Sequence, residues 1–108
     1  MTVTLTLYLL VTNLSPVIGR VLNVGLLFVD DIPGMEVTVG YKTSASAVLI
    51  ARDRVKNENL LPGYEFNFTV RFDQCTEILA VGYTVELIQD YGMDAIIGPT
   101  CSYREFFP

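Results

Sequence analysis

The feature that most constrains the fold is a nearly continuous apolar run over residues 21–29, which contains no charged side chain. Runs of this length are typical of strands that are covered on both faces, as in parallel sheets. Asp30, Asp31, Pro33 and Gly34 follow directly and are expected to end the strand in a loop. Such a strand needs a covering layer on each side of its sheet, so an α/β fold is expected.

Two helical segments carry apolar residues at steps of three and four. The first is expected over residues 38–57, with Thr38 as its cap. Its stripe is expected to comprise Tyr41, Ser44, Ala45, Val48, Ala51 and Val55. The second helix is expected to begin at Asp73 and to stop by Gly92. Its buried stripe is expected to comprise Ile78, Val81, Val85 and Ile88.

Two further strands are indicated by periodicity and by the residues that bound them. Residues 64–72 alternate strictly between apolar and polar side chains, which is typical of an edge strand with one wet face. Residues 93–97 are expected to form a third short strand that ends at Gly98 and Pro99. Strands that alternate with helices form right-handed crossovers. The prediction is therefore a partial doubly wound parallel sheet, with elements in the order β-α-β-α-β and strand order 2-1-3.

Composition argues against several classes of function. The 108 residues carry a formal net charge of −5, and an acidic surface repels nucleic-acid phosphates. Histidine is absent, which removes the commonest general base and the commonest metal ligand. The phosphate-binding patterns GxGxxG and GxxxxGK[ST] do not occur. We therefore expect a chain that is not an enzyme, with no catalytic residues, cofactor, metal or nucleic-acid partner.

Residues 1–19 are predicted to be a secretory signal peptide. Residues 2–19 carry no charge, and their apolar core over residues 5–11 is too short to span a bilayer. Small and turn-forming residues follow this core and lead to Arg20. The positive residues that usually precede such a core are missing, so an uncleaved buried strand or a non-native start is the alternative.

Cys75 and Cys101 are the main candidate pair. Cys75 lies at the start of the second predicted helix, and Cys101 lies just after the third predicted strand. Because the helix runs antiparallel to the strands, both cysteines are expected at the carboxyl edge of the sheet, where a disulfide can form. The bridge would close a loop of about 26 residues and stabilise the fold by roughly 3 to 4 kcal/mol. In a reducing compartment the alternative is two unrelated buried thiols.

Three further features are candidate sites. Asn67 opens a glycosylation sequon on the polar face of the edge strand, although such short sequons also arise by chance. Asp30 and Asp31 could bind a metal or act as acid and base, but adjacent loop carboxylates more often point apart, which favours a solvated turn. Ligand contacts are expected after the strands, in residues 30–37 and 98–102. The specific candidates are Asp30, Asp31, Gly98, Pro99 and Thr100.

Two segments, NENLLPGYEFNFTVRFDQC and ELIQDYGMDAIIGPTC, resemble the N-terminal lobe of the receptor family ligand-binding region. The likeness is greatest to natriuretic peptide receptors and to nematode-type receptor guanylyl cyclases. It rests on a helix that ends in LLPG at residues 60–63, an extended strand over residues 64–72, a cysteine that opens the next helix, and IIGP-x-C at residues 96–101. The resemblance covers about residues 22–101.

The resemblance implies a type I periplasmic-binding-protein fold, a disulfide between Cys75 and Cys101, and an extracellular receptor that often dimerises through its first two helices. It implies a small-molecule or peptide ligand that the parent receptor binds with both lobes, and membrane attachment only through an anchor in the parent. The family continues with another helix after Cys101, whereas this chain ends at Pro108. Residues 20–108 are therefore expected to be a truncated N-terminal segment of the ligand-binding domain, at the cell surface or secreted.

Two alternatives to a receptor of the guanylyl cyclase type are open. The first is an amino-acid-sensing receptor or a solute-binding protein of the same fold, although the paired cysteines and the LLPG turn favour the cyclase-linked type. The second is a small doubly wound enzyme domain of the flavodoxin or response-regulator type, suggested by Asp30 and Asp31 after the first strand. The apolar N-terminus and the sequon weigh against this second alternative.

Overall fold

The structure, a computed structural model, describes residues 19–102, and these form three layers. The middle layer is a sheet of three parallel strands in the order β2-β1-β3. The strands are β1 (Arg20–Phe28), β2 (Tyr64–Phe72) and β3 (Ala95–Ile97). The predicted α/β class and the predicted strand order 2-1-3 are confirmed.

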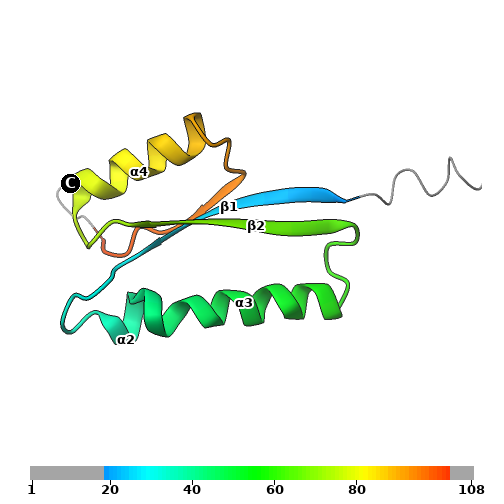
Figure 1. Ribbon diagram of the computed structural model, residues 1–108, viewed down its shortest axis with the longest axis horizontal. Helices are drawn as coiled ribbons and strands as arrows, with labels where there is room; N and C mark the ends of the chain where they lie inside the picture. The colour runs from blue at the N-terminus through cyan, green and yellow to red at the C-terminus, as the bar shows by residue number, and fades with distance from the viewer. Residues whose placement is uncertain (1–18, 103–108) are drawn as a thin grey trace, which may run out of the picture.

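Helices cover both faces of this sheet (Figure 1). One face carries α2 (Glu36–Val39) and α3 (Tyr41–Asn57), and the other carries α4 (Glu77–Gln89). Each helix runs back along the strands that it connects, as right-handed crossovers between parallel strands require. Within residues 19–102, no helix is both long and apolar enough to cross a membrane.

The central strand β1 supplies most of the buried hydrophobic side chains among the described residues. Val24, Leu26 and Phe28 pack against alternate residues of β2 and against Val48 of α3. The opposite face of β1 approaches α4 closely at Gly25, where an added Cβ would lie 3.0 Å from Cδ1 of Leu87. Burial on both faces confirms the prediction drawn from the apolar run and places the core around this one strand.

The prediction of one long helix capped by Thr38 is wrong, because the chain is interrupted at Gly40. The backbone of Val29 donates a hydrogen bond to Val39 (3.1 Å) and accepts one from Tyr41 (2.8 Å). These bonds draw this part of the chain alongside the end of β1 and hold Gly40 extended, with φ −72° and ψ 139°. Thr38 therefore lies inside the short helix α2.

Helix α4 packs with a different face than expected. The predicted stripe of Ile78, Val81, Val85 and Ile88 is exposed, and Ile78 keeps 82% of its surface. Ala80 and Leu87 face the sheet instead and are buried, at 3% and 0% exposure. Apolar residues occur on nearly all sides of α4, so their spacing did not select one face. The small side chain of Ala80 and the space beside Gly25 allow this face to approach the sheet closely.

Helix α4 is also joined to the edge strand β2 by a charged contact. Arg71 of β2 forms an ion pair with Glu86 of α4, with 3.1 Å between Nη2 and Oε1. The Arg71 guanidinium also lies 5.2 Å from the ring centroid of Tyr91, a cation–π distance. The face of β2 that was predicted to be wet is therefore partly covered by α4.

Gly98 is predicted to accept no side chain. Its φ is +143°, a conformation that L residues rarely adopt, and an added Cβ would lie 2.8 Å from Cβ of Leu27. Gly98→Ala should lower the free energy of unfolding by about 2–3 kcal/mol in urea denaturation. The control is Gly82→Ala in α4, where an added Cβ meets nothing within 4 Å. Higher helix propensity should raise its stability by about 0.5–1 kcal/mol, so equal losses in the two variants would contradict the prediction.

Candidate functional site

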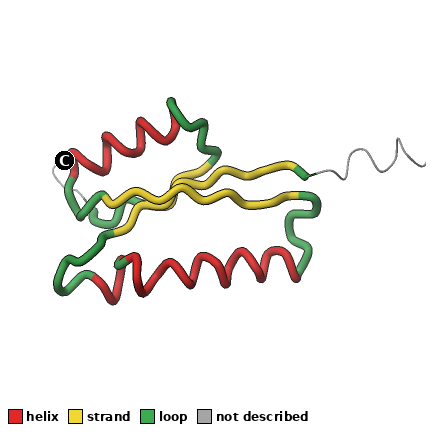
Figure 2. The backbone as a smooth tube through the Cα atoms, viewed as in Figure 1, coloured by secondary structure: helices red, strands yellow, loops and turns green. Residues whose placement is uncertain are grey.

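The carboxyl ends of the three strands meet at one edge of the sheet, which we call the carboxyl edge (Figure 2). Three loops gather there, comprising residues 29–35 after β1, residues 73–76 after β2 and residues 98–102 after β3. The five specific ligand candidates lie in the first and third of these loops, whereas residues 36 and 37 of the predicted range belong to α2. In open α/β sheets, this is the edge at which ligands bind.

Asp73 joins the end of β1 to the second and third of these loops. It is fully buried, and its backbone N–H donates to the carbonyl of Phe28 at the end of β1 (3.1 Å). Its carboxylate accepts hydrogen bonds from the backbone of Cys75 (3.1 Å) and from the backbone of Thr100 (3.0 Å). The Thr100 hydroxyl also donates to this carboxylate. Asp73 was predicted to cap the second helix, and that prediction is wrong because α4 begins after Thr76.

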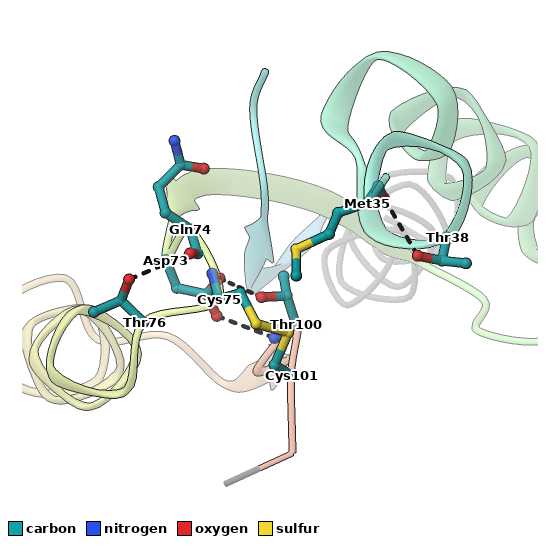
Figure 3. The surroundings of a disulfide bond; sticks show 8 residues. All are labelled: Met35, Thr38, Asp73, Gln74, Cys75, Thr76, Thr100 and Cys101. Carbon is teal, nitrogen blue, oxygen red and sulfur yellow. Dashed lines mark hydrogen bonds between the residues drawn. A yellow bond between two sulfur atoms is a disulfide. The ribbon is translucent and has the colours of Figure 1, made fainter. Parts of the chain in front are cut away.

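Cys75 and Cys101 are joined by a disulfide at this edge (Figure 3). Their Cα atoms lie 5.2 Å apart across 26 residues of sequence, within the range that a disulfide requires. The side chain of Met35, from the loop after β1, points toward the bridge in Figure 3. The bridge thus ties the start of α4 to the segment after β3, on the side where the first loop also approaches.

Gln74 links the first two loops by a two-point contact. Its side-chain amide accepts a hydrogen bond from the backbone N–H of Asp30 (2.8 Å) and donates one to the Asp30 carbonyl (3.0 Å). Sequence analysis singled out neither Gln74 nor the buried role of Asp73. The available signal was the polar pair Asp73 and Gln74 directly after the edge strand. Their hydrogen-bond partners lie 27 and 44 residues away in sequence, respectively, so no local pattern identifies these contacts.

Three carboxylates gather in the loop after β1. The side chains of Asp30, Asp31 and Glu36 each place an oxygen within 4.8 Å of the others, so a third acidic residue is present that sequence analysis did not identify. Glu36 accepts the backbone N–H of Asp31 (2.7 Å), and Lys42 donates to the Asp31 carboxylate (2.7 Å). This hydrogen bond, aided by the opposite charges, raises the pKa of the Lys42 ammonium. These bonds tie Asp31 to α2 and α3, whereas Oδ1 of Asp30 and Oε2 of Glu36 are buried without a hydrogen-bond partner among the described residues.

The ligand candidates differ in what they can offer. Asp31 is exposed, as are Gly98 and Pro99, which are joined by a cis peptide bond. Asp30 is half-buried, and its backbone is engaged by Gln74. Thr100 is half-buried and bound to Asp73, so its polar groups hold the loop in place.

Two hollows occur in the region that the structure describes. One, of about 320 Å³, lies at the opposite edge, between the end of α3 and the start of β2, with Arg52, Lys56 and Glu65 in its wall. The other, of about 220 Å³, is apolar and lies between α4 and Pro99. Neither of these two hollows is lined by Asp30 or Asp31, but the second is lined by Pro99, which is one of the ligand candidates.

Asn67, the sequon residue, is exposed on β2. Its side-chain nitrogen donates a hydrogen bond to Oδ1 of Asn23 on the neighbouring strand β1 (3.0 Å). This nitrogen is the atom to which an N-linked glycan attaches, and it carries a second hydrogen that the contact with Asn23 does not use. Attachment there is compatible with the observed contact.

Residues 43–104, more than half of the chain, match the receptor family ligand binding region. The chain belongs to this family. The matched part of the family region includes α4, β3 and both cysteines, and thus most of the carboxyl edge. This membership favours the receptor interpretation over a flavodoxin-like or response-regulator-like enzyme.

Three relatives from Caenorhabditis elegans show how specific the likeness is. Receptor-type guanylate cyclase gcy-14 is 58% identical over 83 residues, which are 77% of this chain and 8% of the relative. Receptor-type guanylate cyclase gcy-20 is 51% identical over 83 residues, with the same coverage of both chains. Receptor-type guanylate cyclase gcy-7 is 52% identical over 82 residues, 76% of this chain and 7% of the relative. The matched segment of this chain thus spans less than a tenth of each of these three relatives, and no solved structure matches the chain significantly.

Proposed function

We propose that this chain is part of the extracellular ligand-binding region of a receptor-type guanylate cyclase. The observation that carries the proposal is the 58% identity to receptor-type guanylate cyclase gcy-14 within a chain that matches the receptor family ligand binding region. The chain would contribute to ligand recognition, and a ligand-driven rearrangement of the whole receptor would pass the signal on. Catalysis would belong to other parts of the receptor.

The polar chemistry of the carboxyl edge supports recognition rather than reaction. The buried carboxylate of Asp73 is occupied by hydrogen bonds from Cys75 and Thr100, so its oxygens do not face a substrate. Asp31 and Pro99, by contrast, present exposed surface on loops that a rigid sheet holds in place. Loops positioned in this way by a stable scaffold are where binding residues concentrate.

A substitution of Asp31 tests whether the carboxyl edge contacts the ligand. The test uses receptor-type guanylate cyclase gcy-14 in which residues 20–102 of this chain replace the matched segment. In this chimera, Asp31→Asn should raise the stimulus concentration for half-maximal cyclic GMP production by about tenfold, because a charged contact with the ligand is lost. The matched control is Glu65→Gln at the opposite edge. Glu65 is also exposed and also pairs with a lysine, Lys56, at 3.1 Å. Equal responses of the two variants at equal surface expression would contradict the proposal.

We also propose that the protein enters the secretory pathway, with residues 1–19 as its signal peptide and Asn67 as a glycan acceptor. Residues 1–18 lie outside the part that the structure describes. The exposure of Asn67 on β2 and the disulfide at the carboxyl edge both suit an oxidising, glycan-attaching compartment.

Export is tested with the chain expressed in animal cells. Mass spectrometry of the medium should find an N-terminus near Arg20 and a glycan that peptide N-glycosidase removes. Asn67→Gln should abolish the glycan. Asn23→Gln should retain it, because Asn23 belongs to no sequon although it touches Asn67. A chain found only in the cytosol, or one with its glycan unaffected by Asn67→Gln, would count against the proposal.

The partner of this region is proposed to be a second copy of the same receptor. The family resemblance implied contact through the first two helices, and the two helices predicted from the sequence correspond to α3 and α4. These helices lie on opposite faces of the sheet, so one flat interface cannot include the outer sides of both (Figure 1). The outer side of α4 is the more apolar, since Ile78, Val81, Val85 and Ile88 are all exposed there. We therefore assign the contact to α4.

Self-association through α4 is tested by placing a charge on its outer side. Val85→Lys should weaken dimerisation by at least about tenfold in sedimentation velocity, since a charge in the centre of an apolar interface is poorly tolerated. Ile50→Lys on α3 is the control, because Ile50 is also exposed, at 68%. A wild-type chain that stays monomeric, or a dimer that only Ile50→Lys dissociates, would exclude α4 as the interface.

A further inference from the structure

Asp73 lies between the two segments that carry the cysteines. Its Oδ1 accepts the backbone N–H of Cys75 at 3.1 Å, and its Oδ2 accepts the backbone N–H of Thr100 at 3.0 Å. Thr100 directly precedes Cys101 in the sequence. One carboxylate therefore bonds the residue that carries the first sulfur and the neighbour of the residue that carries the second (Figure 3).

The backbone around Cys75 needs this support. Gln74 and Cys75 both have a φ of +53°, in the left-handed region that L residues with bulky side chains avoid. A chain without further contacts would rarely present Cys75 in this orientation. The hydrogen bond from the Cys75 N–H to the Asp73 carboxylate closes a tight turn around the first of these residues, and the bond from the Thr76 N–H to the Asp73 carbonyl closes a turn around both. The paired bonds of Gln74 to Asp30 hold the first.

Asp73 is itself fixed by contacts that do not involve either sulfur. Its N–H donates to the carbonyl of Phe28 at the end of β1 (3.1 Å), and its carbonyl accepts the N–H of Thr76 at the start of α4 (2.9 Å). Its side chain has no exposure to solvent, and water therefore does not compete for the carboxylate oxygens. These backbone contacts hold Asp73 at the end of the paired strands without help from either sulfur.

We propose that Asp73 is a positioning residue for disulfide formation. Its carboxylate holds the segments of Cys75 and Cys101 side by side in the reduced chain, before the sulfurs are joined. This contact restricts the reduced chain, so less conformational entropy is lost when the disulfide closes the loop between Cys75 and Cys101. The effective concentration of one thiol at the other is therefore raised.

The chemical step itself is ordinary thiol–disulfide exchange, with glutathione disulfide as the oxidant. One cysteine thiolate attacks the oxidant, breaks its S–S bond and releases one glutathione thiol. The second cysteine thiolate attacks the protein sulfur of this mixed disulfide and releases the second glutathione thiol. The two cysteines lose two electrons and two protons in total, and glutathione gains them. Asp73 takes part in neither transfer.

The test measures this effective concentration in the full chain. The protein is equilibrated in buffers of defined reduced and oxidised glutathione, thiols are trapped, and the bridged fraction is read by mass spectrometry. Asp73→Asn keeps the shape but replaces one accepting oxygen with a donor, so it should lower the effective concentration by at least about tenfold. Thr100→Val removes only the hydroxyl bond and should lower it by about threefold.

Asp94→Asn is the matched control. Asp94 also accepts a backbone N–H through its carboxylate, from Asn23 at 2.8 Å, but it lies before β3, at the other end of that strand from Cys101. This variant should change the effective concentration by less than about twofold. In guanidinium chloride strong enough to unfold the chain, all variants and the wild type should give the same value, because the hydrogen bonds to Asp73 are then absent.

Several results would overturn the proposal. Equal values for the wild type and Asp73→Asn in native buffer would show that the carboxylate does not position the thiols. Equal losses for Asp73→Asn and Asp94→Asn would point to a general loss of stability. A difference that persists in denaturant would point to local thiol reactivity. A wild-type value that is the same with and without denaturant would mean that the native fold does not bring the thiols together.

Discussion

The burial of β1 on both faces is the constraint on which the rest of the structure depends. Backbone pairing with β2 on one side and β3 on the other leaves its side chains as the only groups that can contact the helices. Val24, Leu26 and Phe28 pack under α3, while Gly25 lets α4 approach the other face. Parallel neighbours require crossover helices, so the three-layer arrangement follows from this one strand.

The same topology explains why the polar contacts concentrate at the carboxyl edge. Parallel strands end at a common edge, and the chain must leave each of them in a loop before the next helix or segment begins. Asp73, Gln74 and the disulfide bind these loops to one another, which leaves Asp31 and Pro99 as exposed groups on a fixed rim. Binding residues concentrate on loops that a rigid scaffold holds in place, which agrees with the proposed role of this edge in ligand recognition.

Much of the fold and part of the site followed from the sequence. The apolar run identified β1, alternation identified β2, and helix direction placed Cys75 and Cys101 at one edge, where the structure also has them. The predictions at Thr38 and Asp73 failed because backbone contacts with β1 compete with local capping preferences. The buried stripe of α4 was assigned to the wrong side of the helix. Because α4 is apolar almost all round, the spacing of its apolar residues does not identify one buried face.

The sequence by itself determined the fold class, the strand order and the family, because the periodicity of apolar residues and short motifs are local properties of the chain. Only the tertiary structure decided the break at Gly40, the buried face of α4, the third carboxylate of Glu36 and the central place of Asp73. These features arise where segments far apart in the chain compete for the same backbone groups or the same space, and no local pattern records the outcome of that competition.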